Sequence, residues 1–271
     1  MKRTSPYKTI SVAVIAVLAV LFIFPLYWIL TGSVKDAAAI NAAVPQWFPL
    51  EPTTDNYIRL FSNPALRWLF NSVFMAVMAM ILTCITASMA GYALAKKRFV
   101  GKQILFSVFI CAMALPKQVI LIPLLKEMAF LNLHDNLWAV ILPTVGWPFG
   151  VFLMKQFSEG IPGELLEAAR IDGANSIQQF FKITIPLLMP AITTCTIGLT
   201  TGALKTYDIL VTSTEGGPGR ASTSIIYYLY TAIFEHKQYG YGSSIAVTLI
   251  ILLLVIALVQ LKFFKKKEVQ L

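Results

Sequence analysis

Charged residues are scarce in this chain: they make up 13% of its 271 residues, whereas 57% are hydrophobic. The mean hydropathy of +0.72 excludes one or two ordinary soluble domains. Cysteine and histidine are also scarce. The cysteines lie inside apolar runs without CxxC spacing and the histidines stand alone in connecting segments, so we expect no disulfide, metal site or cofactor; these residues are Cys84, Cys111, Cys195, His134 and His236.

Motifs that carry chemistry are missing as well. The sequence has no GxxxxGK[ST] phosphate loop and no converging Ser–His–Asp set, so we expect no nucleotide-binding or catalytic site and no enzyme activity in this chain. Acidic residues are nearly absent from the apolar runs, and only Asp208 comes close to mid-depth. This argues against a secondary ion-coupled transporter, which remains the less favoured alternative.

Long apolar runs dominate what is present. Runs of about 18 or more residues, each long enough to cross a hydrocarbon core of about 30 Å, recur along the chain. They predict an all-α integral membrane protein with six transmembrane helices, at Ile10–Leu30, Trp68–Ala95, Ile104–Leu125, Leu137–Met154, Leu187–Lys205 and Tyr241–Leu261. The first run has no cleavage pattern after it, so we expect it to remain as a helix.

The basic residues are distributed unequally between the two faces that six spans define. Fourteen lie on the face that carries both ends of the chain and six on the other, so the positive-inside rule places both termini in the cytoplasm. The net charge of +9 therefore indicates a lipid bilayer rather than a nucleic acid as partner. The division expected is a tail, first span and outer loop over 1–66, a five-helix core over 67–261 with a cytoplasmic loop at 155–186, and a basic tail over 262–271.

That cytoplasmic loop is a polar island between two apolar runs. Glu164–Pro186 reads ELLEAARIDGANSIQQFFKITIP and holds five charged residues. Pro162 opens a first helix, Gly173 suits a left-handed residue that ends it, and Asn175 or Ser176 can cap a second helix at Ile177–Ile183. Leu165, Ala168, Ala169 and Asp172 follow one side of the first helix, where the alanines give a flat surface.

A helix lying on lipid usually carries Lys and Arg on its polar face. The first helix instead carries Glu164, Glu167, Arg170 and Asp172, a net acidic set. This favours docking to a protein over a solvated connector on the lipid surface.

The island resembles the EAA motif in the membrane subunits of binding-protein-dependent ABC importers. That pattern is E-A-A, three residues, G, nine residues, I-x-L-P, and the residues that match it are Glu167, Ala168, Ala169, Gly173, Ile183 and Pro186. Ile185 stands where leucine is usual. Further stretches resemble the carbohydrate permeases of maltose-transporter type: PLYWILTGSVK, WFPLEPTTDNYIRLF, NSVFMAV, GYALAKKRFVGK and IPGELLEAARIDGA.

The resemblance implies the type I importer permease fold and a multi-pass place in a bacterial cell membrane. It also implies the partners: a second homologous permease subunit, two cytoplasmic ATPase subunits, and an extracellular or periplasmic solute-binding protein. The ATPases would dock on Glu164, Glu167, Ala168, Ala169, Arg170, Asp172 and Gly173. The solute is expected to be a sugar or oligosaccharide; a polyol or a glycerol phosphate remains an alternative.

The fifth apolar run is rich in threonine. Thr193, Thr196 and Thr200 share one helix face, so they either bond their own backbone or line a polar solute pathway. Lys117 and Lys205 are costly within a span and normally face a cavity or a partner, although either can reach the outer interface. Trp147 can stack on a sugar ring, but packing beside Pro148 is favoured.

The last outer loop carries a glycine-rich segment. Glycine allows close backbone approach and positive φ. In the maltose-type family the corresponding loop reaches toward the binding protein, so the resemblance implies a binding-protein contact at Glu215, Gly216, Gly217, Gly219 and Arg220. The alternative is a plain turn that packs the aromatic stretch Tyr227–Phe234.

Overall fold

The computed structural model describes residues 6–133, 136–213 and 223–265, and in these ranges every regular element is a helix. Four helices are long and apolar enough to cross a membrane, and a fifth span is obtained if one bent helix pair is counted. The chain divides into two compact units, one formed by residues 1–66 and 228–251 and the other by residues 67–227 and 252–271. Each unit is described by itself.

The first unit contains the long α1 (Pro6–Ser33), the short α2 (Ala37–Ile40) and α3 (Asp55–Ser62), with the π-helical turn η3 (Thr231–Glu235) and the start of α15 (Tyr239–Lys265). The buried Lys35 ties the segment after α1 together: its ammonium donates to the carbonyl of Gln46 and lies 4.7 Å from the centre of the Trp28 ring.

The second unit is organised around α4 (Ala65–Lys96), against which α8 (Pro148–Glu159) and α12 (Met189–Leu204) pack. Ala87 and Leu94 of α4, Met154 of α8, and Ala191 and Cys195 of α12 are among the buried residues of this core. A second cluster joins α4 to α7 (Trp138–Val145) and α13 (Asp208–Ser213). α14 (Ile225–Tyr230) follows, a helix that the sequence analysis did not anticipate.

The span expected at Ile104–Leu125 is wrong as a continuous helix. It is divided into α5 (Lys102–Met113), the 3-10 turn η1 (Lys117–Ile120) and α6 (Leu121–Phe130). Pro116 stands in the gap, where its ring and missing N–H prevent α5 from continuing. The fifth expected span is also bent: the helical stretches Ser176–Leu187 and Met189–Leu204 meet at 71°.

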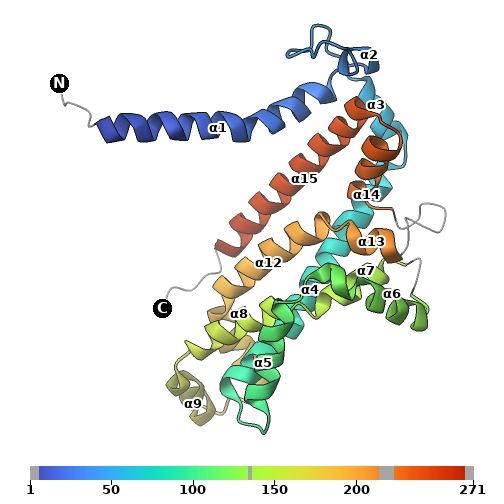
Figure 1. Ribbon diagram of the computed structural model, residues 1–271. Coiled ribbons are helices and arrows are strands. Elements are labelled where there is room, and N and C mark those ends of the chain that lie inside the picture. Colours follow the sequence, from blue (N-terminus) through green and yellow to red (C-terminus); the bar gives the residue numbers. More distant parts are fainter. Residues whose placement is uncertain (1–5, 134–135, 214–222, 266–271) are drawn as a thin grey trace. The chain divides into compact units, whose positions relative to one another are not determined.

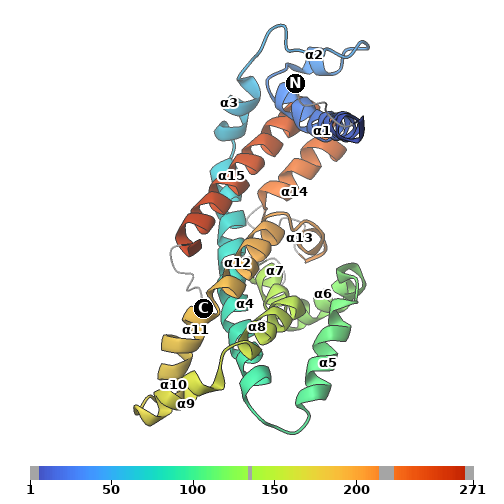
Figure 2. The same ribbon diagram turned by 90° about the vertical axis from the view of Figure 1, so that its left-hand side faces the viewer.

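The polar island lies at one end of the second unit. It contains α9 (Gly163–Ile171), α10 (Ser176–Gln179), the π-helical η2 (Phe180–Thr184) and α11 (Ile185–Leu187). In both Figure 1 and Figure 2, α9 lies at the same end of this unit as the turn between α4 and α5. The second helix expected at Ile177–Ile183 is thus α10 followed by a π-helical turn, a feature often found at functional sites.

Candidate functional site: an exposed helix pair on a buried anchor

Local sequence signals build the two short helices of the island. Gly173 has φ +84°, so the chain turns through the left-handed region where α9 ends, as predicted. Asn175 caps α10: its side chain accepts from the N–H of Gln178 at 2.8 Å, and the Gln178 side chain accepts from the N–H of Asn175 at 2.9 Å. This reciprocal capping box fixes the start of α10 immediately after the turn.

The helices of the island are little covered by the rest of the described chain. No residue of α9 or of α10 is buried within the described chain. Apolar side chains are exposed with the polar ones: Ile171 is 86% and Ile177 69% exposed. Exposed apolar side chains grouped beside charged ones are typical of a surface that another protein covers.

The expected coupling residues lie on this exposed helix. Glu164 stands in the first turn of α9, where the helix dipole favours a carboxylate, and Arg170 in the last, where it favours a cation. The exposed residues are Glu164, Glu167, Ala168, Arg170, Asp172 and Gly173, and Ala169 is partly exposed. The side chains around the two alanines therefore leave α9 open to close approach.

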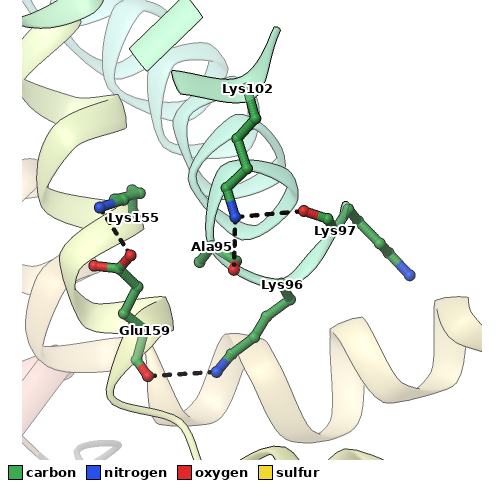
Figure 3. Close-up of polar contacts among 6 residues, drawn as sticks. All are labelled: Ala95, Lys96, Lys97, Lys102, Lys155 and Glu159. Carbon is green, nitrogen blue, oxygen red and sulfur yellow. Dashed lines mark hydrogen bonds and ion pairs between the residues drawn. The ribbon is translucent and has the colours of Figure 1, made fainter. Parts of the chain in front are cut away.

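The segment that leads into α9 is, in contrast, anchored. Ile161 is 2% exposed and belongs to the core formed by α4, α8 and α12. Lys96, at the end of α4, donates from Nζ to the carbonyl of Ile161 at 2.6 Å and to that of Glu159 at 3.4 Å. Figure 3 shows Lys96 reaching Glu159 beside the ion pair of Lys155 and Glu159. No local sequence signal marks Lys96, although it lies in the GYALAKKRFVGK stretch that carries part of the resemblance.

The threonine face of α12 is packed within the second unit. Thr193, Thr196 and Thr200 are all buried. Thr193 donates to the carbonyl of Met189 at 2.8 Å, as the backbone-bonding alternative predicts. Thr196 Oγ1 lies 3.7 Å from Cys84 Sγ of α4, and Thr200 Oγ1 accepts from Gln260 of α15 at 2.8 Å.

The opposite face of α12 borders a cavity of about 360 Å³ that also adjoins α5, α6 and α7. Gly198, Gly202 and Thr206 contribute from α12 and just beyond its end, and Trp147 contributes from the junction of α7 and α8. At 100° per residue these positions lie on the side away from Thr193, Thr196 and Thr200. The sequence pattern singled out the threonines because their hydroxyl groups recur along one helix face. Gly198 and Gly202 have no side-chain functional group that could mark the other face in the same way.

The remaining predicted residues are dispersed or lie outside the described ranges. Lys205 is exposed at the end of α12, and Lys117 begins η1. The expected binding-protein contact, Glu215 to Arg220, falls within residues 214–222, outside the described residues. Among the described residues, no group of three or more His, Cys, Asp or Glu side chains could hold a metal ion.

Comparison with known proteins gives one consistent result. A family described as "Binding-protein-dependent transport system inner membrane component" matches residues 85–267. The arabinooligosaccharides transport system permease protein AraQ of Bacillus subtilis is 34% identical over 200 residues, which are 70% of this chain and 71% of AraQ. The sulfoquinovosyl glycerol transport system permease protein SmoH of Agrobacterium fabrum is 30% identical over 248 residues, 90% of this chain and 87% of SmoH.

Among solved structures, a chain of a bacterial ABC transporter involved in the import of the acidic polysaccharide alginate is similar to this one. The TM-score is 0.84, with 22% sequence identity, over 97% of this chain and 100% of that chain. The likeness shows the fold, which the two chains share along almost their whole length.

Proposed function

Because the chain belongs to the family of binding-protein-dependent transport system inner membrane components, we propose that it is one permease subunit of an ATP-driven type I importer. It forms half of the pathway for a sugar or oligosaccharide that an external binding protein delivers. AraQ, named for arabinooligosaccharide transport, and SmoH, named for a sugar glycoside, support a carbohydrate solute. Because sulfoquinovosyl glycerol is itself a glycerol glycoside, a polyol or glycerol phosphate stays the second candidate within the same class of importer.

The exposure of α9 carries this proposal. A helix with no buried residue, charged at both ends and joined to a buried anchor, is suited to insert into another protein and to pass force back to the core. Since the sequence has no phosphate loop, we place ATP hydrolysis in a separate cytoplasmic subunit that binds α9. A second permease completes the pathway, and two ATPases serve the pair.

For topology, we propose six membrane crossings with both termini in the cytoplasm. The crossings are α1, α4, the broken α5–α6, the consecutive α7–α8, the bent stretch ending in α12, and α15. This arrangement keeps the α4–α5 turn and the island on one side, and it is supported by the end of the second unit that the two share. The biased distribution of basic residues sets that side as the cytoplasm.

For the solute, we propose that Thr193, Thr196 and Thr200 form part of the pathway wall when α12 separates from α4 and α15 during transport. Lys117 and Lys205 would lie nearer its ends. The cavity beside Trp147 provides a second candidate surface on the opposite face of α12. On the outside, residues 215–220 would contact the binding protein.

The proposal is tested by purifying the tagged chain from its own membranes and identifying the proteins that remain bound to it. We expect a second permease and an ATPase to co-purify, and we expect nucleotide binding only with the ATPase present. An Ala168→Arg variant, whose bulk would keep α9 from close approach, should retain the second permease and lose the ATPase. Micromolar ATP binding by the isolated chain, or full ATPase retention by Ala168→Arg, would contradict the proposal.

A further inference from the structure

The last two turns of α4 contact the island at two places. One is the segment that leads into α9, called here the first limb, and the other is the segment that follows α10, called the second limb. On the first limb, Lys96 donates to the carbonyls of Glu159 and Ile161, which end α8 and precede α9. Carbonyls at a helix C-terminus lack intrahelical partners and carry partial negative charge, so an ammonium is well placed there. The Ile161 side chain is also buried in the core of the second unit, so the same residue is held by its carbonyl and by its side chain.

On the second limb, Tyr92 of α4 contacts Phe180, the first residue of the π-helical η2. The two rings meet edge to face with their centres 5.4 Å apart. Tyr92 and Lys96 are four residues apart and so project from the same face of α4. One helix face thus touches the chain both before α9 and after α10.

The same part of α4 is held tightly against α8. A Cβ atom at Gly91 would lie 2.6 Å from Cβ of Met154 and 2.7 Å from the backbone N of Lys155, so only glycine allows this approach. The end of α4 is itself closed by Lys102, which donates to the carbonyls of Ala95 at 3.2 Å and Lys97 at 3.4 Å (Figure 3). α4 and α8 therefore form a firm base at the point where the island begins.

We propose that Tyr92 and Lys96 are positioning residues that hold the two limbs of the island to α4, so that α9 and α4 move together. The inference rests on the proposed function of α9 as the ATPase-binding helix. Without the two anchors, α9 would still be present and exposed, but a movement of the ATPase would flex residues 159–184 instead of shifting the membrane helices. The expected defect is loss of coupling with assembly retained.

The anchor is tested by measuring the distance between spin labels in the assembled complex in nanodiscs. Ile171→Cys at the end of α9 and Ile104→Cys in α5 provide two exposed labelling sites, after replacement of the three native cysteines. Lys96→Met removes the ammonium and Tyr92→Leu removes the ring; each should broaden the distance distribution about twofold, because a segment freed of its packing contacts samples more conformations. Lys96→Arg and Tyr92→Phe, which keep a donor and a ring, should leave it unchanged.

The same variants are then assayed for ATP hydrolysis stimulated by the binding protein and its solute. We expect Lys96→Met to retain basal hydrolysis. Stimulation of hydrolysis by the binding protein should fall about tenfold, which corresponds to the free energy of about one charge-assisted hydrogen bond. Arg98→Met is the matched control, because it removes a basic charge at an exposed position two residues away; it should behave as the parent.

An unchanged distance distribution in Lys96→Met, or equal broadening in Arg98→Met, would overturn the anchor. Broadening without loss of stimulation would overturn its role in coupling. Failure of the anchor can be distinguished from failure of the proposed function. If the proposed function is wrong, Ala168→Arg should retain the ATPase fully, while the label distances still respond to Lys96→Met.

Discussion

Gln260 of α15 donates a hydrogen bond from Nε2 to Oγ1 of Thr200 on α12 at 2.8 Å, joining two helices that are 60 residues apart in sequence. The Thr200 side chain is 2% exposed. Gln260 is partly buried, and its Nε2 also lies 3.8 Å from Sδ of Met80, which is a weaker acceptor than the hydroxyl. This pair is therefore expected to contribute to the stability of the second unit.

Thr200→Val should lower the free energy of unfolding by about 1 kcal/mol, because the Gln260 amide then keeps only its weak contact with the Met80 sulfur. Thr194→Val is the control: Thr194 is exposed and donates only to the carbonyl of Pro190 in its own helix. Adding Gln260→Leu to Thr200→Val should restore part of the loss, since no amide then remains that has only a weak acceptor. Thermal unfolding of the purified complex measures all three, and equal loss in Thr194→Val would refute the special role of the pair.

The two faces of α12 can be separated by their effects on import. If the threonine face lines the pathway, Thr196→Val should reduce solute uptake while ATPase binding persists, and Thr196→Ser, which keeps the hydroxyl, should not. Gly202→Leu fills the cavity on the other face, where a Cβ meets no atom within 4 Å. Uptake that fails only in Gly202→Leu would assign the solute to the cavity face and reject the threonine proposal.

Topology can be checked by labelling single cysteines in intact cells. Val100, in the α4–α5 turn, is fully exposed and Leu50, in the segment between α2 and α3, is 80% exposed. An impermeant thiol reagent should modify Leu50→Cys from outside and should modify Val100→Cys only after the membrane is opened. Ser158 would be a poor reporter because its side chain is fully buried. The reverse labelling pattern would reject the cytoplasmic placement of the island.

The outer glycine-rich segment is tested by replacing Gly216, Gly217 and Gly219 with alanine. If residues 215–220 contact the binding protein, alanine should reduce stimulation of ATP hydrolysis by the binding protein, because its methyl groups prevent close backbone approach. Assembly and basal hydrolysis should persist. Unchanged stimulation would leave this segment as a structural turn.

The sequence was most informative where structure depends on near neighbours. The turn at Gly173 and the capping box of Asn175 and Gln178 need only residues within a few positions, and both were predicted or allowed by the pattern. The anchor of Lys96 on Ile161 joins residues 65 positions apart, and nothing in local periodicity reveals such a contact. A basic residue in a short turn is equally well explained by the positive-inside rule.

The hydropathy pattern also gave a wrong prediction of where a helix is continuous. The run Ile104–Leu125 is apolar except for Ser107, Lys117 and Gln118, and length alone suggested one helix. The break at Ala114–Pro116 follows from proline geometry, which a window average does not register. α14 was missed for a related reason: its aromatic residues follow a glycine-rich segment, and that punctuation favoured a loop.

Gly173 and Gly101 have the same backbone conformation, but only Gly173 ends the helix that is proposed to bind the ATPase. Gly173 ends α9 with φ +84°, and Gly101 precedes α5 with φ +82°. In both cases an added Cβ would meet no atom within 4 Å, so a substitution acts through backbone strain alone. For an ordinary residue this strain costs about 1–2 kcal/mol, and a β-branched residue resists the conformation more strongly.

Gly173→Val should therefore abolish uptake, because relief of the strain would redirect the chain after α9 and displace the helix proposed to bind the ATPase. Gly101→Val carries the same strain in the α4–α5 turn and should retain most uptake at a similar level of membrane insertion. Gly173→Asn should retain uptake too, since asparagine tolerates the left-handed region. Uptake by vesicles, normalised to inserted protein, compares the three; equal loss in both valine variants would mean that strain anywhere at this end of the unit, and not the direction of α9, limits transport.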